Sequence, residues 1–268
     1  MNLYDIRKRY IADKYSDVNA SSRTCQDVLL SKIYKCPLSS NITLKGGVVI
    51  SHISKDKRRA TRDFDLDFIR YSLGDDSIKN FINCLNDVED GVKIEITEPI
   101  EDLKHQEYQG KRVYIALTDR YGNKIETKLD IGIHSKLEVK QEDYCFELNS
   151  TGENVELFVN SIEQMFTEKL FSLLKLGRFS TRYKDIFDFY YFIDSGRVDE
   201  NRLVNYFKEY IFSITDSKWR SIADIHKRLK SILSNEIFLR SANTAQNNWI
   251  ELPVNKVVER ILIFIKNL

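Results

Sequence analysis

Residues 59–68 read RATRDFDLDF, and the second half of this segment alternates strictly between acidic and apolar side chains. Three aspartates share one face and three apolar residues share the other: Asp63, Asp65 and Asp67 against Phe64, Leu66 and Phe68. This pattern predicts a half-buried strand over residues 63–70. Three like charges on one strand face either meet solvent or share a cation.

Carboxylates in this arrangement are candidate ligands for a divalent cation. Same-face neighbours on a strand lie about 7 Å apart, so Asp63 and Asp65 can share one ion or ion cluster. Oxygen ligands with no His or Cys beside them suit Mg²⁺ or Mn²⁺. A third ligand can come from Asp130 in the alternating segment KLDIGIH. Two alternatives stay open: a solvated strand face, and a second, overlapping ligand pair formed by Asp65 and Asp67.

Two glycines precede the aspartates. Gly46 and Gly47 close a predicted strand, NITL at residues 41–44, and Lys45 lies between them and this strand. Glycine lets backbone N–H groups approach a phosphate closely. A Gly-Gly pair alone more often marks a turn, so its position ahead of the aspartates is what favours phosphate binding. The following segment, VVISHIS, is compatible with a helix or with a continued strand.

Periodicity predicts the remaining elements of the first half. Helices are predicted over residues 3–14, 21–35 and 78–88. Further strands are predicted over residues 92–97, 112–118, 124–133 and 143–148, with a hairpin turn at DRYGN.

After about residue 155 the pattern becomes helical. Ser161 and Gln164 have capping-box spacing, and Gly177 stands where a helix C-terminal cap would fall. More helices are predicted near residues 182–194, 199–211, 217–234 and 254–267. We therefore predict an α+β protein, with a mixed sheet and flanking helices at residues 1–157 and a helical bundle at residues 158–268.

Three charged residues in the helical half stand among apolar ones. Lys169 lies on the apolar stripe of its helix, so its amine either extends to solvent or contacts an anion in a cleft. Asp185 and Asp188 form a narrow polar stripe on the segment RYKDIFDFYYFI. The alternative for these aspartates is ordinary charge at a helix start, with Asp188 paired to Lys184.

Composition limits the class of protein. The chain has 268 residues, and 41 basic residues nearly balance 40 acidic ones, so net charge identifies no partner. Local charge is more informative, because five basic residues lie within residues 55–62, either as a phosphate-binding cluster or as a solvated loop. The four cysteines lack the CxxC spacing of a zinc site. With no signal peptide or membrane span in the sequence, we expect a cytoplasmic protein.

The joint pattern is more specific than its parts. The segments LKGG, RATRDFDLDF, LDIG and SIEQMFTEKLFSLLKLGRFSTRYKDIFDFYYF resemble the AbiEii-type nucleotidyltransferases. These are toxins of abortive-infection and type IV toxin–antitoxin systems, within the polymerase-β-like superfamily. The resemblance runs from about residue 25 to residue 194, and it implies a nucleotidyltransferase fold for the sheet.

The resemblance also implies roles for individual residues. Asp63, Asp65 and Asp130 match metal ligands, because the spacing from Arg59 through Thr61 to the aspartates fits the family. Gly46 and Gly47 match the phosphate motif, with Lys45 and Thr61 beside the nucleotide. The last motif supplies the remaining nucleotide-binding and catalytic positions, Lys169, Asp185 and Asp188. The sequence departs from the wider superfamily at Gly47, where Ser is usual, and in the longer gap before Asp63.

The function implied is transfer of a nucleoside monophosphate from an NTP to a hydroxyl group, with Mg²⁺ or Mn²⁺ as cofactor. The acceptor implied is an RNA, such as a tRNA 3′ end, or a protein, and the partner implied is a cognate antitoxin. Two other functions are weighed: an antibiotic-modifying nucleotidyltransferase that acts on small molecules, and a non-catalytic nucleotide-binding module. The long helical half argues against the first, and the intact aspartates and Lys169 argue against the second.

Overall fold

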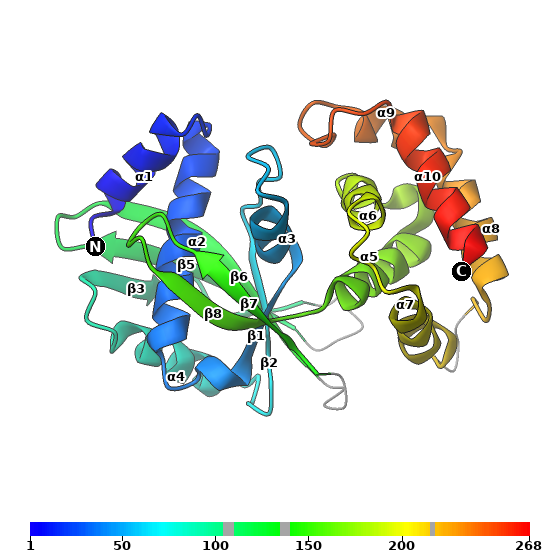
Figure 1. Ribbon diagram of the computed structural model, residues 1–268. Helices are drawn as coiled ribbons and strands as arrows, with labels where there is room; N and C mark the ends of the chain where they lie inside the picture. The colour runs from blue at the N-terminus through cyan, green and yellow to red at the C-terminus, as the bar shows by residue number, and fades with distance from the viewer. Residues whose placement is uncertain (104–109, 135–139, 215–217) are drawn as a thin grey trace. The chain divides into compact units, whose positions relative to one another are not determined.

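The computed structural model describes residues 1–103, 110–134, 140–214 and 218–268 (Figure 1). The chain separates into two compact units, Met1–Asn160 and Ser161–Leu268. The first unit holds a mixed β-sheet with helices, and the second is helical, so the predicted α+β class is confirmed.

One eight-stranded sheet organises the first unit. Its strands are β1 (Ile42–Lys45), β2 (Phe64–Phe68), β3 (Val92–Ile96), β4 (Glu101–Asp102), β5 (Lys111–Asp119), β6 (Lys124–Ile133), β7 (Glu142–Glu147) and β8 (Asn154–Val159). Their order is β3-β5-β6-β2-β1-β8-β7, and β4 pairs with β5. Pairing is parallel between β2 and β6 and between β1 and β8, and antiparallel in the other pairs. The short strand β2 therefore lies in the interior of the sheet, between β1 and β6.

The alternation in β2 places its apolar side chains in the core, as the sequence predicts. Phe64, Leu66 and Phe68 are at most 1% exposed and form part of the core. The ring of Phe68 packs edge-on against Phe81, 5.4 Å away between centroids. Because neighbouring side chains on a strand point to opposite faces, the aspartates are directed to the other face of the sheet.

Within the described residues of this unit, four α-helices accompany the sheet: α1 (Leu3–Ala12), α2 (Asp17–Lys35), α3 (Gly46–Ser54) and α4 (Asp75–Asn86). Helix α2 packs against β6, β8 and α4, whereas α3 packs against β1 and β2. The ambiguous segment after Gly47 is thus a helix, in which Val48, Val49 and Ile50 are completely buried. Tertiary burial of these β-branched residues outweighs their preference for a strand.

Strand β8 corrects the expectation that the chain becomes helical near residue 155. Residues 154–159 are extended and pair with β1 and β7, and the helical part starts only at Ile162. Val155, Leu157 and Val159 are buried on one face. This alternation is the sequence signal for a half-buried strand, so β8 can be identified from its own residues.

The second unit contains α5 (Ile162–Leu176), α6 (Asp185–Asp194), α7 (Glu200–Phe207), α8 (Ile222–Leu233), α9 (Glu236–Ala242) and α10 (Val254–Asn267). The predicted N-terminal cap of α5 is confirmed, because the Ser161 hydroxyl accepts a hydrogen bond from the Gln164 backbone amide, and Gly177 ends the helix. The capping box is not complete, because the Gln164 side chain donates to Glu168 rather than returning to Ser161. Helix α7 is shorter than predicted and continues into a π-helical turn at Lys208–Phe212, and α9 was not predicted. No helix among the described residues combines the length and the apolar character that crossing a membrane requires.

Candidate active site

Four charged residues form a row across four adjacent strands of the sheet. In the β-ladder Asp65 on β2 pairs with Lys45 on β1 and with Asp130 on β6, and Asp130 pairs with Arg112 on β5. Residues paired in register lie on the same face, so two carboxylates stand side by side with a cation at each end. The sheet thus brings together two of the predicted metal ligands, Asp65 and Asp130.

Arg112 holds the carboxylate of Asp130 with both arms of its guanidinium. Nε donates to Oδ1 at 2.8 Å and Nη2 donates to Oδ2 at 2.7 Å. The hydrogen bonds and charge of Asp130 raise the pKa of Arg112. Only 12% of the Asp130 side chain is exposed, so this bidentate pair is partly shielded from water.

Asp63 lies one residue before β2, near the other end of the same face. Its side chain is 42% exposed, and Oδ1 lies 3.2 Å from the Nζ of Lys128 on β6. Two of the three predicted metal ligands, Asp63 and Asp130, are therefore each paired with a cation from the β5–β6 hairpin.

Asp67 occupies a different environment. Its side chain is 6% exposed and lies 2.6 Å from the Nζ of Lys45. Gly132 on β6 leaves room for it, because a Cβ at that position would collide with the Asp67 carboxylate. Burial and this contact make Asp67 the least accessible of the three aspartates in the alternating segment.

The two glycines are packed against predicted site residues. Gly46 has φ +66°, and a Cβ there would collide with the Asp65 carboxylate. A Cβ on Gly47 would lie 2.5 Å from the Thr61 hydroxyl, while the Thr61 carbonyl accepts a hydrogen bond from Gln26 at 3.1 Å. The glycine pair follows β1 directly and opens α3, so backbone N–H groups of a helix start lie next to the aspartates.

Within the described residues, no three Asp, Glu, His or Cys side chains converge closely enough to hold a metal ion. The physical reason is visible in the ion pairs: the carboxylates of Asp63 and Asp130 are directed to Lys128 and Arg112. The donor chemistry still fits a hard divalent cation, because Asp65 and Asp130 are register partners and carry oxygen ligands only.

The second unit brings together its three predicted site residues. The Nζ of Lys169 lies 2.5 Å from Asp185 Oδ1 and 3.1 Å from Asp188 Oδ2. The indole N–H of Trp249 also donates to Asp188, at 3.2 Å. The side chains of Asp185 and Asp188 are 7% and 0% exposed, so neither is an ordinary solvated charge at a helix start.

Sequence reasoning did not single out Arg112, Lys128 or Trp249 as site residues. A signal for Arg112 existed, because the hairpin turn at residues 119–123 sets the β5–β6 register that places it opposite Asp130. Trp249 had no such signal, because it lies 61 residues after Asp188 in the sequence and contacts it only in the folded chain.

Four of the five basic residues within residues 55–62 are paired with nearby groups or buried. Lys55 pairs with Glu147 at 3.2 Å, and Arg58 pairs with Asp56 at 3.1 Å. Lys57 donates to the carbonyl of Asp13, and Arg59 is only 5% exposed. Local acidic partners and burial therefore reduce the charge that this segment presents.

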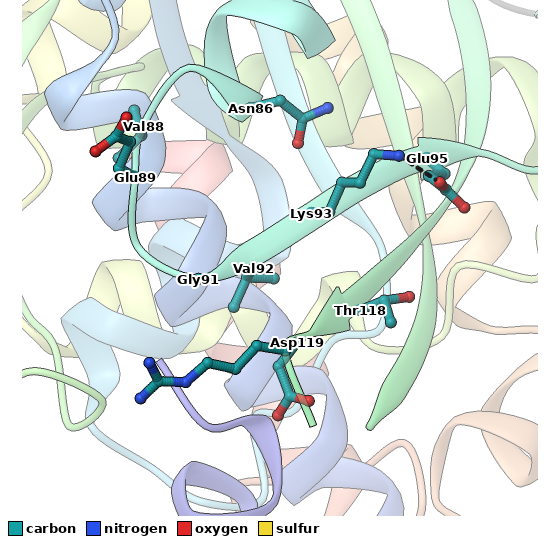
Figure 2. A pocket seen from close by; sticks show the side chains of 10 residues that line it. Asn86, Val88, Glu89, Gly91, Val92, Lys93, Glu95, Thr118 and Asp119 are labelled. Carbon is teal, nitrogen blue, oxygen red and sulfur yellow. Dashed lines mark hydrogen bonds and ion pairs between the residues drawn. The ribbon is translucent and has the colours of Figure 1, made fainter. Parts of the chain in front are cut away.

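A shallow hollow of about 410 Å³ lies elsewhere in the first unit (Figure 2). It is bounded by the end of α4 and by β3 and β5, and Lys93, Glu95 and Asp119 are among its lining residues. None of the predicted site residues lines it.

Comparison with known proteins identifies the family. Residues 28–249 match the sequence model described as nucleotidyl transferase AbiEii toxin, type IV TA system. The chain belongs to the AbiEii nucleotidyltransferase toxin family. The resemblance seen in the sequence is thereby confirmed, and so is the enzyme class, a nucleotidyltransferase. Membership in this AbiEii family implies a nucleotide substrate and an antitoxin partner.

A solved structure is also similar to this AbiEii family chain. It is an antigenic nucleotidyltransferase-like protein from Paracoccidioides brasiliensis, with 17% sequence identity and a TM-score of 0.40. The match covers 83% of this chain and 91% of that one. No curated protein matches the chain.

Proposed function

We propose that this AbiEii family enzyme transfers a nucleoside monophosphate from an NTP to a hydroxyl group of an RNA, such as a tRNA 3′ end, or of a protein. The acceptor oxygen forms a bond to the α-phosphorus, the α–β phosphoanhydride bond breaks, and pyrophosphate and the acceptor proton leave. The observation that carries this proposal is the pairing of Asp65 with Asp130 directly beside the glycine-led start of α3.

Asp63, Asp65 and Asp130 would hold Mg²⁺ or Mn²⁺ in this enzyme. Such an ion supplies charge neutralisation on the triphosphate and lowers the pKa of a bound hydroxyl. The acidic residues contribute oxygen ligands from adjacent strands, and Gly46 leaves room for the Asp65 carboxylate. We place Asp67 outside the ligand set, because its carboxylate is buried against Lys45.

The backbone around the glycines would bind the triphosphate. The first N–H groups of α3 lack partners within the helix and carry the positive end of its dipole, which favours a phosphate. Gly46 and Gly47 let a phosphate approach this backbone, and Thr61 packs directly against Gly47. Lys45 stands at the helix start, where its charge adds to the attraction for an anion.

In the second unit we assign nucleotide phosphate binding to Lys169. Asp185 and Asp188 hold its amine from two sides and so fix its position. Trp249 in turn holds Asp188. In this assignment Asp185 and Asp188 orient the lysine, and family resemblance supports a role for both in the reaction.

Family membership supports a toxin role for this activity. Modification of RNA or protein would stop growth, and a cognate antitoxin would suppress the modification. The test is incubation of the purified protein with α-labelled NTPs and either total RNA, total protein or aminoglycosides. Label on RNA or protein that Asp65→Asn abolishes supports the proposal. Label on aminoglycosides alone would indicate a small-molecule enzyme, and bound NTP with no pyrophosphate release would indicate a non-catalytic module.

A further inference from the structure

Two cationic side chains of the β5–β6 hairpin form ion pairs with carboxylates that the proposed function assigns to metal binding. Arg112 binds both oxygens of Asp130, and Lys128 contacts Asp63. These pairs form on one face, because Arg112 pairs in register with Asp130 and Lys128 stands two residues before Asp130 on β6. A divalent ion that takes Asp63 and Asp130 as ligands competes with Arg112 for both oxygens of Asp130 and with Lys128 for Oδ1 of Asp63.

The displaced cations would then face a phosphate. A guanidinium donates two parallel hydrogen bonds to a phosphate as readily as to a carboxylate, and an ammonium binds either as a point charge. Asp63, Asp65 and Asp130 with Arg112 and Lys128 leave a formal charge of −1 on this part of the face. A divalent ion reverses that sign, so the face attracts a triphosphate only after the metal has bound.

We infer that Arg112 and Lys128 exchange partners during the reaction cycle: they neutralise Asp130 and Asp63 before metal binds, and bind the NTP triphosphate afterwards. The inference rests on the proposed function. Its consequence is cooperative binding, in which metal increases the affinity for nucleotide and nucleotide increases the affinity for metal by the same factor.

Two variants separate this exchange from a purely structural ion pair. Arg112→Gln and Lys128→Gln remove the competing cation and keep a polar side chain. We expect each to bind Mn²⁺ alone more tightly than the parent protein does, by about tenfold for Arg112 because its bidentate, charge-assisted contact with Asp130 is lost. In saturating Mn²⁺, each should bind nucleotide more weakly by a similar factor. The two affinities thus change in opposite directions, which the loss of a structural contact alone does not produce.

The probes are Mn²⁺ alone, measured by electron paramagnetic resonance, and the four α,β-methylene nucleoside triphosphates, measured by calorimetry. Lys124→Gln is the matched control, because Lys124 stands on the same strand and pairs with Glu126 at 2.7 Å, away from the aspartates. It should leave both affinities unchanged. Thermal melting shows whether each variant folds, and Lys128→Gln serves if Arg112→Gln does not, because its partner Asp63 is 42% exposed.

The outcomes distinguish the inference from the proposed function. Parent protein that binds Mn²⁺ through Asp65, with variants that change neither affinity or weaken both, overturns the partner exchange and leaves the proposed function intact. Parent protein whose Mn²⁺ binding is absent, or is unaffected by Asp65→Asn, overturns both. Tighter Mn²⁺ binding together with weaker nucleotide binding, in a folded variant, supports the exchange.

Discussion

Lys45 pairs in the β-ladder with Asp65, but its Nζ lies 2.6 Å from Asp67, the next residue on the same face of β2. This contact gives two neighbouring aspartates different environments. Asp67 is engaged by a lysine and buried, whereas Asp65 lies between the glycine-led helix start and Asp130. The two overlapping aspartate pairs in the sequence are therefore not equivalent in the structure.

We expect Asp65→Asn and Asp67→Asn to separate activity from stability. Asp65→Asn should abolish nucleotide transfer and leave thermal stability unchanged or raised, because it relieves repulsion with Asp130. Asp67→Asn should retain most activity and lower the free energy of unfolding by about 1–3 kcal/mol, because the Lys45 amine loses its charged partner. Transfer assays and urea unfolding measure both. Loss of activity in Asp67→Asn with no effect in Asp65→Asn would reverse the assignment of ligands.

Lys169→Met should lower the free energy of unfolding of the protein. Methionine keeps the apolar stem of the side chain, but Lys169 neutralises two carboxylates, of Asp185 and Asp188, that are nearly inaccessible to water. Removing one partner of a buried ion pair costs about 3–5 kcal/mol. Urea unfolding of the variant measures this loss.

A control for Lys169 tests its proposed phosphate contact separately from stability. Lys169→Arg keeps the charge, and Lys175→Met removes a lysine six residues further along the same helix. We expect nucleotide affinity, measured by calorimetry, to fall in Lys169→Arg while Lys175→Met binds like the parent protein. Unchanged nucleotide affinity in a folded Lys169→Arg would make Lys169 a purely structural residue.

Gly46→Ala should abolish transfer activity. Alanine is strained at φ +66°, and its Cβ would displace the Asp65 carboxylate. Gly122→Ala is the matched control, because Gly122 has φ +83° and no heavy atom within 4 Å of an added Cβ. Both variants should lose about 1 kcal/mol of stability from backbone strain, but Gly122→Ala should keep its activity. Equal activity in the two variants would show that the space beside Asp65 is not needed.

Stability should depend on the protonation of His52. Burial, together with the charges of Arg23 and Lys55, holds the pKa of His52 well below its usual value. The unfolded chain then binds a proton that the folded chain does not, so stability is present above about pH 6.5 and falls as pH decreases below it. His52→Gln should lose this part of the pH dependence between pH 6.5 and 5.

The comparison with His52→Gln is needed because a second titrating group changes stability in the opposite direction as pH falls. Burial raises the pKa of Asp27, so its protonation favours the folded state as pH falls. Subtracting the unfolding free energies of His52→Gln from those of the parent protein at each pH cancels that contribution. A difference that stays constant with pH would show that folding does not lower the pKa of His52.

Local patterns were sufficient to predict most elements and the family. Strand β6 has the predicted bounds, because ten residues alternate between its two faces, and α10 has them as well. The Ser161 cap is encoded within four residues of sequence. Such features depend on neighbours in the chain, so periodicity and spacing identify them without any knowledge of the fold.

Contacts between distant segments needed the folded chain. Whether VVISHIS forms a helix depends on its burial against β1 and β2, and the ion pairs of Lys169 depend on how α5 and α6 pack. The aspartates are evident in the sequence, but the cations that hold Asp63 and Asp130, Lys128 and Arg112, are identified only by the fold. The side chains on one face of a strand can be read from its own sequence. The charged residues opposite them depend on strand order and register, which are properties of the whole sheet.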